Sequence, residues 1–254
     1  MTNPNLSTST DKMRVYTGSA ILFACILIST LIVGPIILLC IVFPFSVRYK
    51  IAGHWINFIL WVAKVACGIT CEVEGLENIK GINAAVVLSK HQSAWETIAL
   101  RQILPPQTAL LKRSLLWLPI WGWALATLKP IAIDRDNQLG ALRTLIDQGT
   151  ASLKQGLWVV VFPEGTRVAP GKKKKFNAGG AMLAHKSGYP VIPVAHNAGE
   201  CWPRYSFLKY PGTIKVKIGP AIDSKNRKAT EINAEAEAWI AKTMKEISSL
   251  EALA

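Results

Sequence analysis

The chain has 254 residues, enough for one sizeable α/β domain together with a membrane segment. Half of the residues are hydrophobic, and the formal charge of +13 indicates an anionic partner: nucleic acid, an anionic membrane surface or a phosphorylated substrate. The basic residues are not interleaved with aromatic residues on a recognisable reading element, which argues against nucleic acid. The five cysteines lack the C-x-x-C pairs of a zinc site, so we expect no metal site and reduced, buried thiols.

An apolar stretch dominates the N-terminal part of the chain. No charged residue lies between Arg14 and Arg48, and the segment 16–45 is longer than the about 20 apolar residues that a membrane-crossing helix needs. The apolar core of a cleavable signal peptide is shorter and ends at a small-residue cleavage site, which this stretch lacks. Gly34-Pro35 predicts a kink in this helix or its division into two shorter ones.

A second apolar segment, 51–69, contains several aromatic residues and one lysine, Lys64. This composition suits a helix in the membrane interface, a crossing helix or an ordinary buried helix, and a single span, a hairpin and a dip into one leaflet all fit the pattern. Flanking basic residues place the following domain on the cytoplasmic side of the membrane. We expect 1–69 to be a membrane-anchoring helical segment without a catalytic group, so that a chain beginning near Thr70 would keep its fold.

From about residue 70, short apolar runs alternate with longer mixed segments. Strands are expected at 84–89, 108–112, 130–133, 157–162, 191–195 and 214–219, and helices at 93–103, 137–155, 179–187 and 230–250. This alternation predicts an α/β fold for 70–254, with a mostly parallel central sheet flanked by helices and preceded by the apolar helical membrane segment. In such sheets the functional groups gather where strands end, so the motifs that follow two of the strands are the candidates for a site.

The first motif, Lys-His-Gln-Ser-Ala-Trp-Glu at 90–96, follows the strand expected at 84–89. An imidazole at a strand end can act as a general base when a carboxylate fixes its tautomer. Glu96 can reach His91 only if His91 lies in the loop and Glu96 in the first helical turn. The same residues also fit a capping box, in which Glu96 would merely bind the amide of Ser93. The motif by itself leaves both interpretations open.

The second motif, Phe-Pro-Glu-Gly-Thr-Arg at 162–167, follows the strand expected at 157–162. Gly165 would let backbone amides approach an oxyanion, while Thr166 and Arg167 would supply a hydroxyl and a bidentate guanidinium for a phosphate monoester. The alternative is an ordinary turn closed by an ion pair between Glu164 and Arg167.

With His91 and Glu96 upstream of this motif, the chain from about residue 70 to 220 resembles the glycerolipid acyltransferase family. The first block of that family is His-x4-Asp, and Glu96 stands here in place of the aspartate. The second block ends in an arginine after an apolar strand, which corresponds to Arg135, although the glycine that usually opens the block is missing. The third block is matched in full by 162–167, and the fourth, a strand with a proline, by 191–194.

A lysine-led segment before the second block resembles Lys112 and the residues after it, but Ser114 stands where many members have glutamate, so only Lys112 carries over. The resemblance implies direct transfer: His91, held by Glu96, would take the proton from the acceptor hydroxyl as that oxygen attacks an acyl thioester. The phosphate-binding pocket would comprise Arg135, Arg167, Lys112, Glu164, Gly165 and Thr166.

The resemblance further implies that the chain needs no cofactor and uses acyl-CoA or an acyl-carrier-protein thioester as co-substrate. The implied acceptor is 1-acyl-glycerol-3-phosphate (lysophosphatidic acid), the implied product is phosphatidic acid, and the implied location is a bacterial inner membrane. Another lysolipid, a glycerol phosphate and an amino-acid lipid remain alternative acceptors. A non-enzymatic protein that binds anionic lipid is the alternative from another class, and it would not need His91, Glu96 and Arg167 in one cleft. The four lysines at 172–175 suit either a solvated loop or contact with anionic headgroups.

Overall fold

The structure, a computed structural model, describes residues 9–134 and 136–250 of the chain. Over these ranges seven strands form one sheet in the order β1-β7-β6-β2-β5-β3-β4. The strands are β1 (Ile69–Glu74), β2 (Val86–Ser89), β3 (Gln107–Lys112), β4 (Ile131–Ile133), β5 (Trp158–Val161), β6 (Val191–His196) and β7 (Gly212–Ile218). Neighbouring strands pair in parallel except β6 and β7, which are antiparallel. The predicted α/β fold with a mostly parallel sheet is confirmed.

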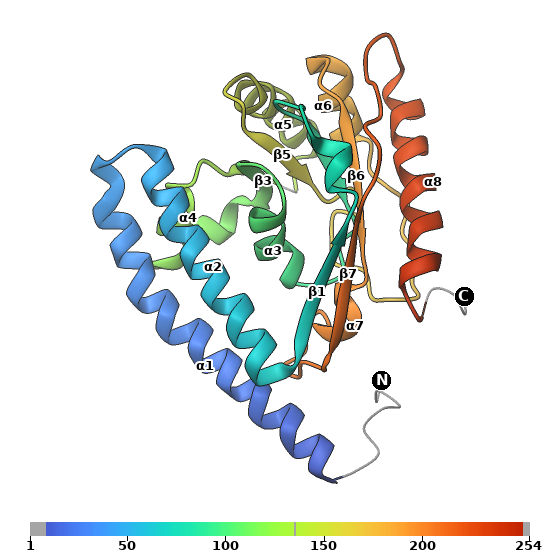
Figure 1. Ribbon diagram of the computed structural model, residues 1–254. Helices are drawn as coiled ribbons and strands as arrows, with labels where there is room; N and C mark the ends of the chain where they lie inside the picture. The colour runs from blue at the N-terminus through green and yellow to red at the C-terminus, as the bar shows by residue number, and fades with distance from the viewer. Residues whose placement is uncertain (1–8, 135, 251–254) are drawn as a thin grey trace.

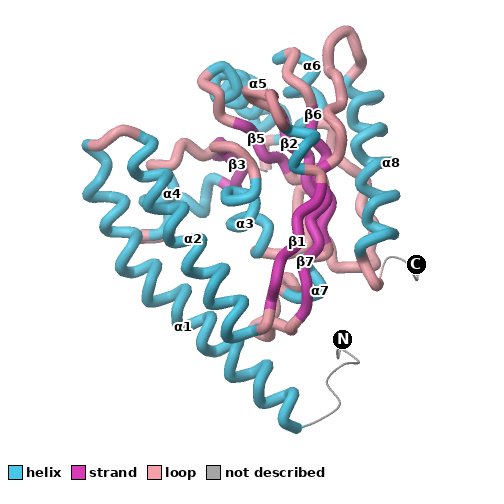
Figure 2. The backbone as a smooth tube through the Cα atoms, in the orientation of Figure 1, coloured by secondary structure: helices cyan, strands magenta, loops and turns pink. Residues whose placement is uncertain are grey.

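Helices cover both faces of this sheet. They are α1 (Ser9–Leu39), α2 (Phe45–Cys67), α3 (Trp95–Ile103), α4 (Trp121–Ala126), α5 (Gln138–Lys154), α6 (Gly179–Ser187), α7 (Ala198–Cys201) and α8 (Ala229–Ile247). Short 3-10 helices occur at Cys40–Val42, Leu76–Ile79 and Arg113–Trp117. Figure 1 shows α8 on one side of β1 and β7, and α3 with the α1–α2 hairpin on the other side. The tube in Figure 2 shows the same layers, with the sheet between the helices.

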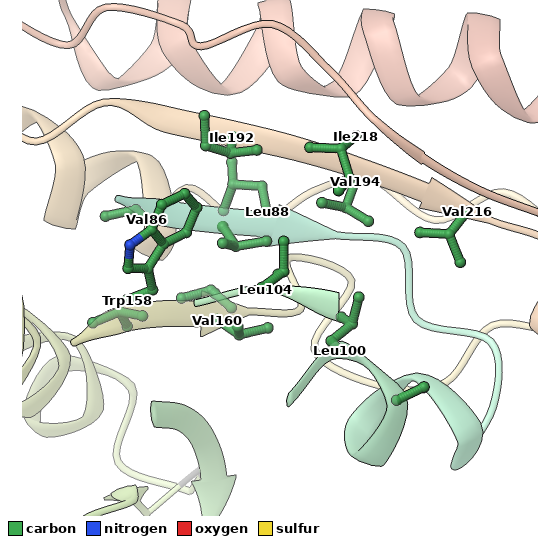
Figure 3. Close-up of a cluster of buried hydrophobic side chains, with 14 of the residues drawn as sticks. Val86, Leu88, Leu100, Leu104, Trp158, Val160, Ile192, Val194, Val216 and Ile218 are labelled. Atoms are coloured by element: carbon green, nitrogen blue, oxygen red, sulfur yellow. The ribbon is translucent and has the colours of Figure 1, made fainter. Parts of the chain in front are cut away.

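The central strands are buried along their whole length. Every residue of β2 and β5 is buried, as expected for parallel strands that helices cover on both faces. Figure 3 shows Val86 and Leu88 of β2 beside Trp158 and Val160 of β5 in the core. Truncation of one such side chain, for example Leu88→Ala, costs about 2–5 kcal/mol of stability because the packed core cannot close over the gap. This rigid centre holds the strand ends in fixed positions.

At the edge of the sheet lies β1, a strand that the sequence pattern did not reveal. Among the residues that the structure describes it pairs with β7 alone, and one of its six residues is buried. It therefore lacks the continuous apolar run by which the central strands were recognised. Its Cys71 is exposed, and the prediction of buried cysteines is therefore wrong for this residue. Cys67 and Cys201 are buried, Cys25 and Cys40 are half-buried, and all five thiols are free.

The helix α1 runs without interruption through Pro35 to Leu39, so the predicted division into two helices is wrong. A proline removes one backbone hydrogen bond, and here it does so only four residues before the helix ends. The segment Ser9–Val42, which consists of α1 and the 3-10 helix after it, is long and apolar enough to cross a membrane. Its most apolar window of 18 residues has a mean hydropathy of 2.9, and only 11% of that window is buried. These properties are compatible with a membrane protein.

The helix α2 has two different faces. Ile59, Val62 and Ala63 belong to the same hydrophobic core as the sheet, whereas Trp61 and Val65 are exposed. The described part of the predicted anchoring segment, 9–69, is therefore not packed separately from the rest. A chain beginning near Thr70 would expose the surface that α2 covers, so we expect it to lose its fold, contrary to the expectation from sequence.

Candidate active site

The site lies where three adjacent central strands end. In the order β6-β2-β5, His196 is the last residue of β6, Lys90 and His91 follow β2, and Glu164 follows β5. Because all three strands are parallel, these four residues meet at the same edge of the sheet. The two motifs of the sequence analysis follow β2 and β5, which are neighbours in the sheet, so both lie at this edge.

His91 and Glu96 form a hydrogen-bonded pair, with 2.8 Å between Nδ1 and Oε1. The helix α3 begins at Trp95, so His91 lies in the loop and Glu96 in the first turn, the only arrangement in which the two can meet. The same Oε1 accepts hydrogen bonds from the amides of Gln92, at 3.0 Å, and Ser93, at 2.8 Å. The capping bond and the bond to the imidazole thus coexist, and the two interpretations of Glu96 are not exclusive.

The surroundings of Glu96 favour its ionised form. Complete burial by itself would raise its pKa, but the neighbouring His196, the hydrogen bond and charge of His91 and the amide of Ser93 together hold the pKa below its ordinary value. An ionised Glu96 accepts the Nδ1–H of His91 and leaves Nε2 of that ring to take a proton. The imidazole is also stacked on Phe162, with 4.1 Å between the ring centroids, which restricts its rotation.

Glu164 is placed differently from the prediction. It is fully buried, it does not line the cavity described below, and its Oε1 lies 2.5 Å from Nζ of Lys90. Its Oε2 accepts a hydrogen bond of 2.7 Å from the amide of His91. Burial raises the pKa of Glu164, and the charge of Lys90 opposes this effect. The alternative of a turn closed by Glu164 and Arg167 is not realised, because Lys90 takes the place of the arginine.

A cavity of about 1060 Å³ opens in front of His91. Its polar lining includes His91, Lys112, Gly165, Thr166, Arg167 and Lys174. Its apolar lining includes Ile26, Val33, Gly34 and Ile37 of α1, Ala52, Trp55, Ile56 and Ile59 of α2, and Leu110, Leu125 and Leu142. A cavity with a cationic wall and a large apolar wall fits a molecule that has a phosphate and a fatty chain.

Most of the predicted phosphate-binding residues reach this cavity. Lys112, at the end of β3, lines it together with Thr166 and Arg167. Gly165 lines it too, and its φ of 69° is a left-handed conformation that a side chain disfavours; a Cβ there would also lie 3.0 Å from Asn177. Arg135 lies outside the described residues.

Several residues of the site did not follow from the motifs. Lys174 and Asn177 line the cavity beside the start of α6, and Arg204 donates a hydrogen bond to the main-chain carbonyl of Arg167. Lys90 and His196 flank the His91 loop from within the protein. Two of them had a visible signal: Lys90 stands directly beside the histidine of the first motif, and Lys174 belongs to the run of four lysines at 172–175. Across the described ranges no group of three or more His, Cys, Asp and Glu side chains is suited to hold a metal ion.

Comparison with known proteins gives matches of three kinds. The sequence profile of the family described as Acyltransferase matches residues 70–197. The 1-acyl-sn-glycerol-3-phosphate acyltransferase of Pseudomonas aeruginosa is 49% identical over 214 residues, which are 83% of each chain, and that of Limnanthes alba is 28% identical over 80% of this chain and 72% of its own. The crystal structure of the 1-acyl-sn-glycerophosphate (LPA) acyltransferase PlsC from Thermotoga maritima covers 94% of this chain and 98% of its own, with a TM-score of 0.79 and 23% identity, and shows the same fold.

Proposed function

Because the chain belongs to the acyltransferase family, we propose that it transfers a fatty acyl chain from an acyl thioester to the free hydroxyl of 1-acyl-glycerol-3-phosphate. The product is phosphatidic acid, and the reaction is a step of phospholipid biosynthesis. The observation that carries this proposal is the His91–Glu96 pair at a cavity that has cationic residues on one wall and apolar residues on another.

The reaction needs one base and no protein nucleophile. Nε2 of His91 takes the proton of the acceptor hydroxyl as that oxygen bonds to the thioester carbonyl carbon, and Glu96 stabilises the imidazolium that forms. When the tetrahedral intermediate collapses, the carbon–sulfur bond breaks and the thiolate takes the proton from His91. Cys201 is unsuited to act as a nucleophile, since it does not line the cavity and burial raises its pKa to about 11.

Cations on the cavity wall bind the phosphate of the acceptor. Lys112 and Arg167 line the cavity, and over the described residues neither forms an ion pair with an acidic side chain. Thr166 adds a hydroxyl beside them, and Arg135 joins them according to the order of the family blocks. The acyl chain of the acceptor or of the donor occupies the apolar part, formed largely by α1 and α2.

The donor is acyl-CoA or an acyl-carrier-protein thioester. Neither needs a resident cofactor, since the thioester itself is the activated group. The lysines at 172–175 are exposed next to the cavity, where positive charge attracts the phosphates of coenzyme A, an acidic carrier protein or anionic headgroups.

The α1–α2 hairpin holds the protein on the inner membrane, with the sheet on the cytoplasmic side. Large apolar side chains of α1, such as Phe23, Ile28 and Leu39, are exposed by 58%, 58% and 78%. A soluble surface would not tolerate such a continuous apolar face, whereas lipid would cover it. Trp117 and Trp123, exposed by 77% and 51%, extend this face near α4 with side chains that favour the membrane interface.

A non-enzymatic lipid-binding protein is the second candidate, but it would not need a carboxylate-held imidazole at the same cavity as Arg167. The deciding experiment is an acyl-transfer assay of the purified protein in detergent, with lysophosphatidic acid and a panel of other lysolipids and with both thioester donors. We expect transfer to lysophosphatidic acid, with a rate that is lower by about 10²–10⁴-fold in His91→Ala. Lipid binding without transfer from either donor would overturn the proposal in favour of the second candidate.

A further inference from the structure

One peptide unit, that between Lys90 and His91, is held at both of its polar atoms by side chains from the neighbouring strands. Its carbonyl oxygen accepts a hydrogen bond from Nε2–H of His196, at 2.8 Å. Its N–H donates to Oε2 of Glu164, at 2.7 Å. The two side chains come from opposite sides of β2, because β6 and β5 are its two neighbours in the sheet.

Glu164 and His196, the two side chains that bind this peptide unit, are themselves held in place by other residues. Both are fully buried. Nζ of Lys90 lies 2.5 Å from the other carboxylate oxygen of Glu164, so the residue before His91 neutralises the carboxylate that binds His91. Nδ1 of His196 accepts from the amide of Ala198, at 3.3 Å, which leaves the proton of a neutral ring on Nε2, where it faces the carbonyl of Lys90. Burial lowers the pKa of His196, which favours the neutral ring, while the charge of Glu96 acts in the opposite direction.

The rest of the loop is bound in the same way. The amide of Lys90 donates to the carbonyl of Val194, and the carbonyl of His91 accepts from the amide of Val168. A rotation of the peptide unit before His91 would break the bonds to His196 and Glu164 together. Since that peptide sets the direction in which the His91 side chain leaves the backbone, its rotation would move Nε2 away from the acceptor hydroxyl. A displacement of about 1 Å at a reacting group can cost about 10²-fold in rate.

We propose that Glu164, His196 and Lys90 are positioning residues that act through the Lys90–His91 peptide, rather than substrate-binding residues. This inference rests on the proposed role of His91 as the base. It assigns to Glu164 a function inside the protein, although its motif neighbours Thr166 and Arg167 face the cavity. It also gives a function to His196, a histidine whose ring does not line the cavity.

The test compares steady-state kinetics of Glu164→Leu, His196→Leu and His196→Gln in detergent. Glu164→Leu removes the acceptor of the His91 N–H, and His196→Leu removes the donor to the Lys90 carbonyl. Each should lower kcat by about 10–100-fold while KM for acceptor and donor changes by less than about threefold. His196→Gln keeps an N–H donor that can reach the Lys90 carbonyl, so it should recover a large part of the kcat lost in His196→Leu. His185→Gln is the matched control, because His185 is exposed on α6 and pairs with the carbonyl of Arg227; its kcat should equal that of wild type.

A second measurement applies even where Glu164→Leu folds poorly. The double variant Lys90→Met/Glu164→Leu removes both buried charges and leaves neither unpaired, and it should fold with the same low kcat. Nitrogen-15 NMR of the four histidines reads their tautomers directly. We expect a neutral His196 protonated at Nε2 in wild type, and a change in the His91 signals in Glu164→Leu and His196→Leu that is absent from His185→Gln.

Three results would overturn the inference. A raised acceptor KM with unchanged kcat in Glu164→Leu would place this residue in the phosphate pocket. Wild-type kcat in a folded His196→Leu protein would show that the hydrogen bond from His196 to the Lys90 carbonyl has no function in catalysis. A His196 ring protonated at Nδ1 would show that His196 does not donate this hydrogen bond. If wild-type protein transfers no acyl chain to any acceptor, the proposed function fails instead, and the NMR spectra still decide whether the peptide is held as described.

Discussion

In the wall of the cavity that carries His91, the side chains are buried and hydrogen-bonded to one another. His91 contacts Glu96 and Phe162, and its backbone is bound by Glu164 and Val168. In the wall that carries Lys112 and Lys174 the side chains are exposed, and within the described residues neither is paired with a carboxylate. One wall is already ordered by the protein, whereas the other presents charge that a ligand can neutralise.

This difference indicates that the two walls of the cavity affect different kinetic constants. A preorganised base loses little entropy when the reaction begins, so changes there should lower kcat. Exposed cations contribute to binding in the ground state and in the transition state alike, so changes there should raise KM. A raised KM from changes at the buried wall, or a lowered kcat from changes at the exposed cations, would contradict this interpretation.

The largest effect is expected at the buried wall. His91→Ala removes the general base and should lower kcat by about 10²–10⁴-fold. Glu96→Gln should lower kcat by about 10²-fold or more, because the amide cannot stabilise an imidazolium. The double variant should be little worse than His91→Ala, since the two residues act as one unit. Steady-state kinetics in detergent measure all three, and near-wild-type turnover in Glu96→Gln would reduce this residue to a helix cap.

The next effect is expected at the cationic wall. Arg167→Ala and Arg135→Ala should each raise KM for the phosphorylated acceptor by about 10–100-fold, the equivalent of about 1.5–3 kcal/mol for a charged hydrogen bond. KM for the thioester donor should change much less. Arg143→Ala is a matched control, since Arg143 is exposed on α5 and pairs with Asp147. An unchanged acceptor KM in both variants would remove these arginines from the phosphate site.

A smaller effect concerns stability and pH. The folded pKa of Glu96 lies below its ordinary value of 4.5, so its ionised form contributes stability at higher pH, and this contribution is lost as the pH falls through the folded pKa. Wild type should therefore lose stability below about pH 4.5 more steeply than Glu96→Gln does. Urea unfolding in detergent over a pH series measures the difference. If the free energy of unfolding depends on pH in the same way in both proteins, the surroundings of Glu96 do not stabilise its ionised form.

The smallest effect on turnover is expected from the exposed loop at 172–175. Replacement of Lys172, Lys173 and Lys175 by glutamine, with Lys174 retained because it lines the cavity, should weaken binding to anionic vesicles by at most about 1 kcal/mol per lysine. The kcat measured in detergent should stay at the wild-type value. Equal binding of both proteins to anionic and neutral vesicles would show that this loop is an ordinary solvated one.

The sequence predicted the parts of the fold that depend on local pattern. The apolar runs of β2 and β5 identified strands buried on both faces, and the motifs after them identified His91, Glu96 and Arg167. β1 was missed because an edge strand buries little and carries no such run. Lys90 and His196 were not assigned to the site because their contacts depend on which strands are neighbours, and the order β6-β2-β5 is a property of the whole sheet. For the same reason, the part that α1 and α2 take in the cavity wall had no local signal.

The pairing of β1 with β7 has a consequence for the order of events during synthesis. The paired residues Thr70 and Thr213 are 143 positions apart in the chain. β1 therefore leaves the ribosome long before β7, its one partner among the described residues, has been made. The core-facing residues of α2, directly before β1, also stay unpacked during this time, because the residues that they contact include some in the later strands. The proposed attachment of α1 to the bilayer would shelter this unfinished N-terminal part while translation continues, so a delay in membrane targeting should produce aggregation of the nascent chain rather than a slow enzyme.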